Sequence, residues 1–388
     1  MKPFSFHNPT LIDFGEGTVN NLARHIKPLA TKVLLVYGGG SIKKTGLYDQ
    51  VLQQLTEIGI ETIELAGVEP NPRVTTVRKG IALCRERGVD FILAVGGGSV
   101  LDAAKAVAAG VPYQGDVWDF LIHKAKIKSA LPLGTILTLS ATGSEMNGNS
   151  VITNWELKLK KAFGSIHTYP KFSILDPTLT YTLPRDQTCN GIVDMMSHVF
   201  EQYFSLTTDT PLQERLCESI LQTVIENGEI ALAHPTNYEA RANLMLCGTY
   251  ALNGGMISVG VQGDWATHGI EHEVSAIYDI PHGVGLAILF PNWMRYVYRQ
   301  RADRFVQYAT RVWHVDPSGK SADEIVLEGI AATREYFNRI GMPATLKDVN
   351  IDETHIDQMA KEAVVFGKIG SFKSLDEQDV RAILRMSL

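Results

Sequence analysis

Cysteine is scarce in this sequence of 388 residues. The four cysteines, Cys84, Cys189, Cys217 and Cys247, are far apart and form no C-x-x-C pair. This usage argues against a disulfide framework and against a cysteine-type zinc site. It is typical of a reducing compartment, so we expect the protein in the cytoplasm.

Long apolar runs and clusters of basic residues are also missing. No stretch of about 18 apolar residues could span a bilayer, and MKPFSFHNPTLIDFGEG at the start contains no apolar segment of a signal peptide. The formal net charge is −6, without a run of Lys and Arg. We therefore expect neither a membrane nor a nucleic-acid partner. The length suffices for two domains, each with its own core.

The first half of the chain alternates between predicted strands and helices. Apolar, β-branched runs predict strands at 32–39, 61–68, 90–97 and 131–140. Helical spacing of apolar residues predicts helices at 46–59, 74–88 and 99–110. This alternation is typical of a parallel sheet with helices on both faces, joined by right-handed crossovers.

Strand signals nearly vanish from about Pro184 onward. Amphipathic segments predict helices at 185–204, 211–232, 236–255, 264–278, 284–312, 322–340, 354–366 and 375–387. We expect an α/β domain over residues 1–184 and an all-helical domain over residues 185–388. The boundary is placed near LDPTLTYTLPRD (175–186), where two prolines bracket a short extended stretch.

Two of the predicted strands end in the same glycine-rich sequence, GGGS, at 38–41 and 96–99. Such a run lets a ligand approach the backbone closely, and the helix that follows offers free N–H groups to an anion. Each run alone could be a tight turn, but two in one sheet, one followed by Asp102 and Lys105, favour a nucleotide. Neither matches the ordinary Rossmann fingerprint G-x-G-x-x-G. A third loop, SATGSEMNG (140–148), could line the same crevice.

The stretch DWATHGIEHEVSAIYDIPHG (264–283) contains three histidines within fifteen positions, His268, His272 and His282. His268 to His272 spell H-x-x-E-H, the inverzincin pattern of some zinc peptidases, with Glu271 as the residue that activates water. A second interpretation depends on spacing alone. His268 and His272 share one helical face, in a helix that we expect to start at Asp264 as N-cap.

Further side chains extend this second interpretation. Asp194 and His198 are also four residues apart, and His282 follows Pro281 on a predicted short loop. One carboxylate and up to four imidazoles suit Fe²⁺ or Zn²⁺, and are too rich in nitrogen for Mg²⁺ or Ca²⁺. Any single histidine could still be an ordinary surface or core residue. We interpret the others in that way: His7, His25, His123, His167, His234, His314 and His355.

Taken together, these motifs resemble those of the iron-containing, or group III, alcohol dehydrogenases. The shared motifs are GGGS-V-x-D-x-x-K at 96–105, S-A-T-G-S-E at 140–145, LDPxLTYTLP at 175–184, D-x-x-x-H at 194–198 and H-x-x-x-H-x(9)-H at 268–282. YGGGSIKKTG (37–46), GVEPNPR (67–73) and EARANLM (239–245) are closer to the branch of butanol dehydrogenases and broad-specificity aldehyde reductases. The resemblance implies a Rossmann-like dinucleotide-binding domain followed by a helical metal-binding domain, a fold similar to that of dehydroquinate synthase.

The resemblance also implies roles for individual residues. The metal ligands would be Asp194, His198, His268 and His282, whereas His272 would lie beside the metal as a candidate proton relay. The H-x-x-E-H match is then accidental, and Glu271 is not a general base. The implied cofactor contacts are Gly38, Gly39, Ser41, Asn71, Gly97, Gly98, Ser99, Asp102, Thr138, Ser140, Thr142 and Lys160. Cys189 stands where the family usually has an aliphatic residue, which should not affect the chemistry.

The implied reaction is hydride transfer between NAD(P)H and a small aliphatic aldehyde or primary alcohol, in a cleft between the domains. The metal would polarise the carbonyl, and His272 or the ribose hydroxyls would supply the proton. A peptidase would leave the glycine loops without a function. A lyase such as dehydroquinate synthase needs many basic residues, but the segments around the ligands are apolar or acidic. A protein that only binds ligands has little use for an open metal site.

Two further expectations concern the partner and the cofactor. The family is commonly dimeric, so we expect a homodimer, in which residues 11–22 could place an edge strand against the partner's sheet. After the first predicted strand the chain reads Tyr37-Gly-Gly-Gly-Ser41-Ile-Lys43-Lys44, without an acid that would repel a 2′-phosphate. Charge-assisted bonds from this turn should favour the 2′-phosphate by roughly 1–3 kcal/mol. We expect NADPH to be used at least as well as NADH, unless both lysines point into solvent.

Overall fold

The computed structural model describes residues 1–388, which form two compact units. The sheet unit consists of His7–Pro184 and His234–Gly254. The helical unit consists of Met1–Phe6, Arg185–Ala233 and Gly255–Leu388. None of the helices has both the length and the apolar character needed to cross a membrane.

The sheet unit is built on six parallel strands. Their order across the sheet is β1 (Leu11–Phe14), β8 (Phe172–Leu175), β5 (Leu133–Leu137), β4 (Phe91–Gly96), β2 (Lys32–Tyr37) and β3 (Glu61–Leu65). The four strands predicted from apolar runs are present as β2 to β5. Strand β1 lies in the segment 11–22 where an edge strand was expected, and it pairs with this chain's own β8. Strand β8, and an antiparallel hairpin of β6 (Asn149–Asn154) and β7 (Leu159–Gly164), were not predicted.

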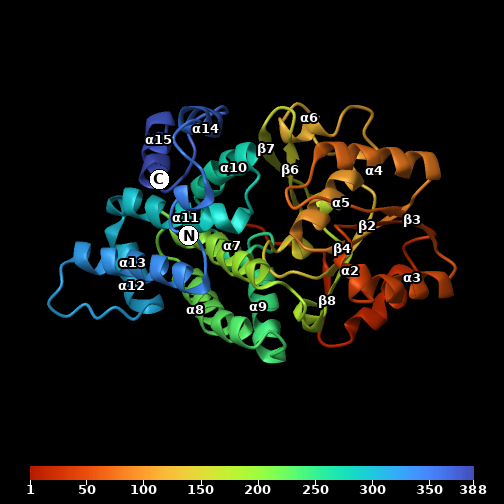
Figure 1. The fold of residues 1–388 in the computed structure, drawn as a ribbon, viewed down its shortest axis with the longest axis horizontal. Helices are drawn as coiled ribbons and strands as arrows, with labels where there is room; N and C mark the ends of the chain where they lie inside the picture. The colour runs from red at the N-terminus through yellow and green to blue at the C-terminus, as the bar shows by residue number, and fades with distance from the viewer. The chain divides into compact units, whose positions relative to one another are not determined.

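Helices cover both faces of this sheet, as the βα alternation predicts. Helices α4 (Val74–Arg87) and α5 (Gly98–Gly110) lie on one side, and α3 (Leu47–Glu57) lies on the other with α1 (Leu22–Ile26) (Figure 1). Alternate residues of β2 serve the two layers. Leu34 and Val36 are buried with the side chains of α4 and α5, whereas Val33 and Leu35 are buried with those of α1 and α3. Because every strand pair of the sheet is parallel, the carboxyl ends of all six strands meet at one edge.

One helix beyond residue 184 belongs to the sheet unit. Helix α9 (Tyr238–Ala251) is held there because Thr249 donates a hydrogen bond to Glu145 Oε1 at 2.6 Å. Just after the helix, Leu252 O accepts from Asn147 Nδ2 at 2.8 Å. The compact units differ from a single division at 184/185, because residues 1–6 belong to the helical unit and residues 234–254 belong to the sheet unit. Where the boundary between independently folding domains lies stays a prediction.

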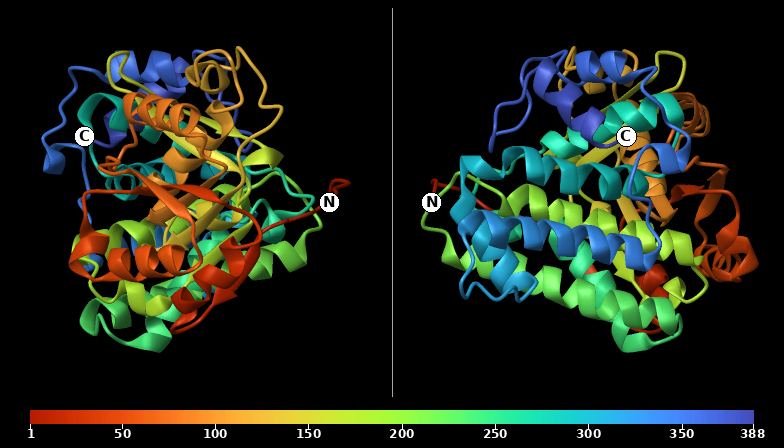
Figure 2. Two further views of the ribbon diagram at one scale, coloured as in Figure 1. Left: turned by 90° about the vertical axis from the view of Figure 1, so that its right-hand side faces the viewer. Right: turned by 60° about the vertical axis from the view of Figure 1, so that its left-hand side comes forward.

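The helical unit contains the remaining long helices. They are α7 (Arg185–Tyr203), α8 (Pro211–Ala233), α10 (Ala266–Tyr278), α11 (His282–Val297), α12 (Ala302–Val312), α13 (Ala322–Ile340), α14 (Ile356–Ala363) and α15 (Glu377–Met386). The segment expected at 284–312 is two helices, because the chain turns at Tyr298–Gln300. Helices α7, α8, α11 and α13 run side by side (Figure 2).

A proline inside α11 is compensated by a distant arginine. Pro291 has no N–H, so the carbonyl of Ala287 one turn earlier loses its helical partner. Arg334 of α13 donates to Ala287 O and to Ile288 O, each at 2.9 Å. Burial lowers the pKa of Arg334 to about 10, which still leaves it a cation near neutral pH. This contact ties α13 to the middle of α11.

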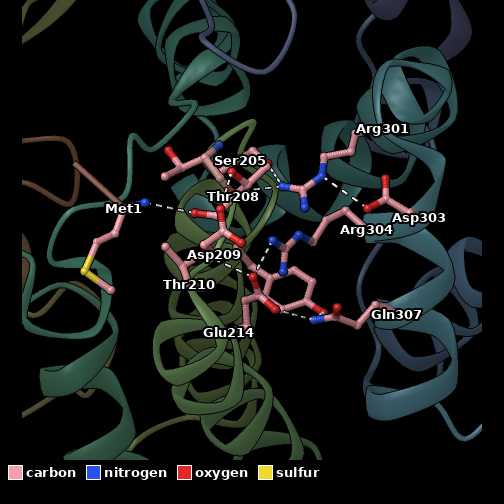
Figure 3. Close-up of polar contacts among 12 residues, drawn as sticks. Met1, Ser205, Thr208, Asp209, Thr210, Glu214, Arg301, Asp303, Arg304 and Gln307 are labelled. Carbon is pink, nitrogen blue, oxygen red and sulfur yellow. Dashed lines mark hydrogen bonds and ion pairs between the residues drawn. The ribbon is translucent and has the colours of Figure 1, made fainter.

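Helix α12 is fixed to the α7–α8 region by a buried ion pair (Figure 3). Arg304 is 2% exposed and donates to Glu214 Oε1 at 2.6 Å, while Gln307 donates to Glu214 Oε2 at 3.1 Å. Burial opposes ionisation of Glu214, but these hydrogen bonds outweigh it and lower the pKa of Glu214 to about 2. Arg301 also donates to the carbonyl of Ser205 at 2.8 Å.

Candidate metal centre and dinucleotide site

The four predicted metal ligands lie on three helices of the helical unit. Asp194 and His198 are on α7, His268 is on α10, and His282 is the first residue of α11. The expected loop position of His282 is therefore wrong. Pro281 is the N-cap of α11, and proline at a helix start needs no N–H partner.

The expected start of α10 is also corrected. The N-cap is Trp265, with a φ of 67°, and the helix begins at Ala266. Asp264 lies one residue earlier, where its Oδ2 accepts from Ala266 N at 3.3 Å. Its other oxygen accepts from Phe372 N at 2.6 Å. The Asp264 carboxylate thus still serves the helix start, although the residue itself is not the cap.

The candidate ligand atoms converge. Atoms of Asp194, His268 and His282 lie within 4.8 Å of one another. Asp194 Oδ1 is 3.6 Å from His282 Nε2 and 3.7 Å from His198 Nε2. The rings of His198 and His268 are stacked, with centroids 4.8 Å apart.

Burial makes this cluster costly without a cation. Asp194 and His268 are 3% and 7% exposed, and Asp194 Oδ1 and His268 Nε2 have no hydrogen-bond partner. A buried polar atom without a partner is destabilising, and a buried carboxylate more so. Oxygen and imidazole nitrogen donors that face one another in this way fit a divalent cation such as Fe²⁺ or Zn²⁺.

Two buried glutamates orient the histidines of this cluster. Glu201 Oε1 accepts from the backbone N and the Nδ1 of His268, at 3.0 and 2.8 Å. Glu271 Oε2 is hydrogen-bonded to His282 Nδ1. Both glutamates are fully buried. A carboxylate at Nδ1 fixes the tautomer that leaves Nε2 as the donor to a metal.

The sequence contained a signal for both glutamates. Glu201 follows Asp194 and His198 at positions i+7 and i+3, so all three share one face of α7. Glu271 lies three residues after His268 on α10. The glutamate of H-x-x-E-H thus has a structural partner, His282, which the peptidase interpretation does not give it.

His272 lies one helical turn after His268. Its ring centroid is 5.6 Å from that of His282. A ring nitrogen of His272 lies within 4.8 Å of ligand atoms of Glu271 and His282. Asp194 instead forms such a group with His268 and His282. This position is beside the cluster, within reach of a molecule bound there.

The residues expected to contact a dinucleotide gather at the carboxyl edge of the sheet. Gly38, Gly39 and Ser41 follow β2, Gly97, Gly98, Ser99 and Asp102 lie at the start of α5, Thr138, Ser140 and Thr142 follow β5, Asn71 precedes α4, and Lys160 is on β7. The turn after β2 needs glycine at position 40, where φ is 97°. At Gly98 a Cβ would meet the Thr142 side chain at 2.4 Å, so the loop after β5 packs against the start of α5.

Asp102 and Lys105 hold the loop at 140–149. The Asp102 carboxylate accepts from Ser144 Oγ at 2.6 Å and from Val151 N at 2.9 Å. Lys105 is fully buried and donates to Ser144 Oγ at 2.8 Å and to Asn147 Oδ1 at 3.0 Å. Burial lowers the pKa of Lys105 to about 8. Asp102 and Lys105 thus support the loop that packs against the glycine-rich start of α5. Direct contact between Asp102 and a cofactor stays a prediction.

A cavity of about 350 Å³ opens between the turn after β2 and the segment before Pro184. Ser41 and Thr138, two of the predicted contacts, line it, together with Leu179, Thr182 and Leu183. Hydroxyls and apolar side chains in one cavity suit a ribose with an attached base. No ligand contact was expected from 178–183, although these residues belong to the motif LDPxLTYTLP.

The Lys43 side chain is 48% exposed, but neighbouring side chains hold its ammonium group. Its ammonium lies over the Tyr48 ring, 4.3 Å from the centroid, and 3.8 Å from Glu64 Oε2. Tyr37 and Tyr48 donate to the two oxygens of Glu64, at 2.5 and 2.7 Å. The hydrogen bond from Tyr37 lowers the pKa of Glu64 and keeps it charged. An acid from β3 therefore stands beside the turn after β2, which the sequence had suggested was free of acids.

These features define a class of protein, with glycine-rich turns at the edge of a parallel sheet and a buried centre of histidine and aspartate in a helical unit. The comparisons with known proteins identify the class. Residues 9–177 match the family described as iron-containing alcohol dehydrogenase, and residues 188–388 match its C-terminal part. The chain belongs to the iron-containing alcohol dehydrogenase family.

Individual relatives cover the whole chain. It is 54% identical over 388 residues to a probable NADH-dependent butanol dehydrogenase of Bacillus subtilis, with 100% of both chains covered. It is 45% identical to the NADPH-dependent aldehyde reductase YqhD of Escherichia coli, with 93% of both covered. The crystal structure of an NADH-dependent butanol dehydrogenase of Thermotoga maritima superimposes with a TM-score of 0.96 at 44% identity, covering 100% of this chain and 99% of the other.

Proposed function

We propose that the protein transfers hydride between a nicotinamide dinucleotide and a small aliphatic aldehyde or primary alcohol. The observation that carries this proposal is that two buried atoms, Asp194 Oδ1 and His268 Nε2, have no hydrogen-bond partner in a cluster that suits a divalent ion. The names of the relatives, butanol dehydrogenase and aldehyde reductase, support the substrate class.

Asp194, His198, His268 and His282 would hold the metal, which by the family description is iron, with zinc as the alternative that the ligand set allows. When bound, the ion supplies Lewis acidity and the dinucleotide supplies the hydride. Glu201 and Glu271 keep the Nε2 atoms of His268 and His282 directed at the site. The glycine-rich turns and the start of α5 bind the dinucleotide phosphates through backbone N–H groups.

We propose that His272 handles the proton and does not bind the metal. Its ring centroid is 5.6 Å from that of His282, so its ring lies next to the place where a substrate oxygen would bind, as a proton relay requires. His272→Ala should keep the metal content and lower kcat or change its pH profile. His268→Ala should lose metal and activity together. Loss of metal from the His272 variant in proportion to activity would make His272 a ligand.

The relatives named for NADH and for NADPH support use of both dinucleotides here. The exposed Ser41 and Lys43 of the turn after β2 favour NADPH, whereas Glu64 beside Lys43 offsets part of that charge. We therefore propose shared use, with NADPH at least as good as NADH. A preference for NADH of tenfold or more in kcat/KM would contradict it.

We propose a cytoplasmic homodimer. Strand β1 is the edge of this chain's own sheet, paired on one side with β8, so its other side can pair with the β1 of a second copy. Light scattering at twice the chain mass of 42.7 kDa would agree, and a monomer under dilute native conditions would not.

The experiment that tests the activity uses metal-analysed protein loaded with Fe²⁺ or Zn²⁺. A panel of aldehydes is offered with NADH and with NADPH, and oxidation of the dinucleotide is followed by absorbance. We expect turnover with butanal that disappears with a chelator and returns with the ion. No turnover of any aldehyde by the loaded protein, together with hydrolysis of a peptide substrate, would favour the peptidase alternative.

A further inference from the structure

Trp265 stands beside the candidate metal centre with much of its side chain uncovered. Its ring centroid is 5.5 Å from that of His268 and 6.4 Å from that of His198. It is 39% exposed, whereas Trp293 of the same unit is fully buried. An indole that is partly uncovered beside a cluster of candidate ligands offers an apolar face to a molecule bound there.

The backbone at Trp265 is held in a conformation that bulky residues rarely adopt. Its φ is 67°, in the left-handed region. Three neighbours impose this conformation. Glu201 Oε2 accepts from Trp265 N at 2.6 Å, Gly269 N donates to Trp265 O at 3.2 Å, and Gly263 leaves room for the indole, because a Cβ there would lie 2.7 Å from Trp265 Nε1.

The Glu201 carboxylate therefore holds both a candidate ligand and the backbone of Trp265. Glu201 orients His268 through Oε1 and sets the backbone of Trp265 through Oε2. The backbone from which the indole projects is consequently fixed relative to His268. Unusual backbone that the surrounding structure over-determines tends to occur where a ligand is clamped.

We propose that Trp265 is the apolar wall of the substrate site and determines which aldehydes react. This inference rests on the proposed function. The indole packs against the rings of His268 and His198, with centroids 5.5 and 6.4 Å away, so an aldehyde whose oxygen lies among the Nε2 atoms of the cluster has its first carbons next to the uncovered part of the indole. A flat, fixed ring stacks well on an unbranched alkyl chain. A branch at the carbon next to the carbonyl would hold the chain off that ring, so straight chains are preferred.

The expected effects follow from buried apolar area. Along the series ethanal, propanal and butanal, each added methylene group that the indole covers should raise kcat/KM by roughly fourfold. In Trp265→Ala this increment should fall to roughly twofold or less. The wild type should prefer butanal over 2-methylpropanal by roughly tenfold or more, and Trp265→Ala should reduce this preference to within about threefold. Trp265→Phe, which keeps a flat ring, should stay nearer the wild type.

A second readout needs no turnover. Co²⁺ added to the metal-free protein quenches indole fluorescence at short range, so binding at the cluster should quench Trp265 strongly. The Co²⁺-dependent loss of fluorescence should therefore be smaller in Trp265→Phe than in the wild type, at unchanged Co²⁺ stoichiometry. The matched control is Leu327→Ala on α13, which removes an apolar side chain with the same 39% exposure elsewhere in this unit.

The outcomes separate this inference from the proposed function. If the wild type reduces no aldehyde, the proposed function fails. If the wild type is active but Trp265→Ala, with wild-type metal content, keeps the chain-length and branching ratios, only the role of Trp265 is overturned. If Trp265→Ala does not fold, Trp265→Leu replaces it, since leucine keeps apolar volume without the flat face. Unchanged ratios in that variant would overturn the inference equally.

Discussion

Replacing Glu201 with glutamine tests whether the buried carboxylate sets the affinity of the metal centre. The substitution keeps the size of the side chain and removes its charge. The wild-type carboxylate accepts three hydrogen bonds, from Trp265 N at 2.6 Å, from His268 N at 3.0 Å and from His268 Nδ1 at 2.8 Å. An amide offers one oxygen and one NH₂ group. If the oxygen stays with His268, the NH₂ group faces the N–H of Trp265, donor against donor.

The magnitude can be bounded from these contacts. Loss of a partner behind a metal-binding histidine typically weakens metal binding by roughly 10- to 100-fold, or about 1.4–2.7 kcal/mol. Glu201 is fully buried, so water cannot replace the lost acceptor. We therefore expect Glu201→Gln near the upper end of this range.

The assay is competition between the metal-free protein and a chelator of known affinity for Zn²⁺ and Co²⁺. Glu218→Gln is the matched control, because Glu218 is a 7% exposed glutamate of the same unit that accepts from Tyr203 and Gln307 and contacts no candidate ligand. Glu218→Gln should bind metal like the wild type. A folded Glu201→Gln protein with wild-type affinity for both ions would refute the assigned role.

Three further predictions concern other contacts. Arg334→Met should lower the free energy of unfolding by about 1–3 kcal/mol, because it leaves a buried carbonyl at Ala287 without a donor. In a Pro291→Ala background, where residue 291 regains its N–H, the loss should be smaller by about 1 kcal/mol, and strict additivity in denaturant titrations would contradict this account. Glu214→Gln should destabilise the protein by roughly 1–3 kcal/mol at neutral pH. The folded pKa of Glu214, about 2, lies below its ordinary 4.5, so the wild-type advantage should be complete above pH 4.5 and lost as the pH falls toward 2. The difference in unfolding free energy between the wild type and Glu214→Gln should shrink between pH 4.5 and pH 2. A difference that stayed constant over this range would count against the ion pair with Arg304 as its source. Glu64→Gln should raise the ratio of kcat/KM for NADPH over NADH by roughly two- to fivefold, since the ammonium of Lys43 is no longer offset. Glu61→Gln, which removes an acid of the same strand that pairs with Lys32, should leave the ratio unchanged.

The sequence predicted the elements whose own residues fix their type. Strands β2 and β4 are six residues long and almost wholly buried, so they appear as apolar runs. Strand β1 has four residues, none of them fully buried, and exists because Phe14 and its neighbours pair with β8, which is more than 150 residues away. Such a strand depends on its tertiary partner, which no local pattern records.

In the site, too, residues recognisable from local sequence differ from contacts that depend on distant partners. The histidines and Asp194 could be chosen as candidate ligands from the sequence, because metal ligands must be of a few residue types and two pairs of them stand at helical spacing. The contact of Lys43 with Glu64 joins the end of one strand to its neighbour, and the sequence alone indicated neither the direction of Lys43 nor the acid beside it. The compensation of Pro291 by Arg334 spans 43 positions and has no sequence signature.

The glutamates of the centre reveal how the three helices depend on one another. Helix α7 provides the candidate ligands Asp194 and His198, and its Glu201 orients the candidate ligand His268 of α10. Helix α10 in turn provides Glu271, which orients His282 of α11. Each carboxylate thus acts on a ligand from a different helix, so the ligand geometry is correct only when α7, α10 and α11 are packed correctly. The H-x-x-E-H stretch contributes a candidate ligand, the partner of another candidate ligand and the candidate proton relay from one helical face. A peptidase would need that glutamate to face water, but here it is fully buried and hydrogen-bonded to His282. The same five letters therefore support a centre whose affinity depends on helix packing, and they do not support a hydrolytic one.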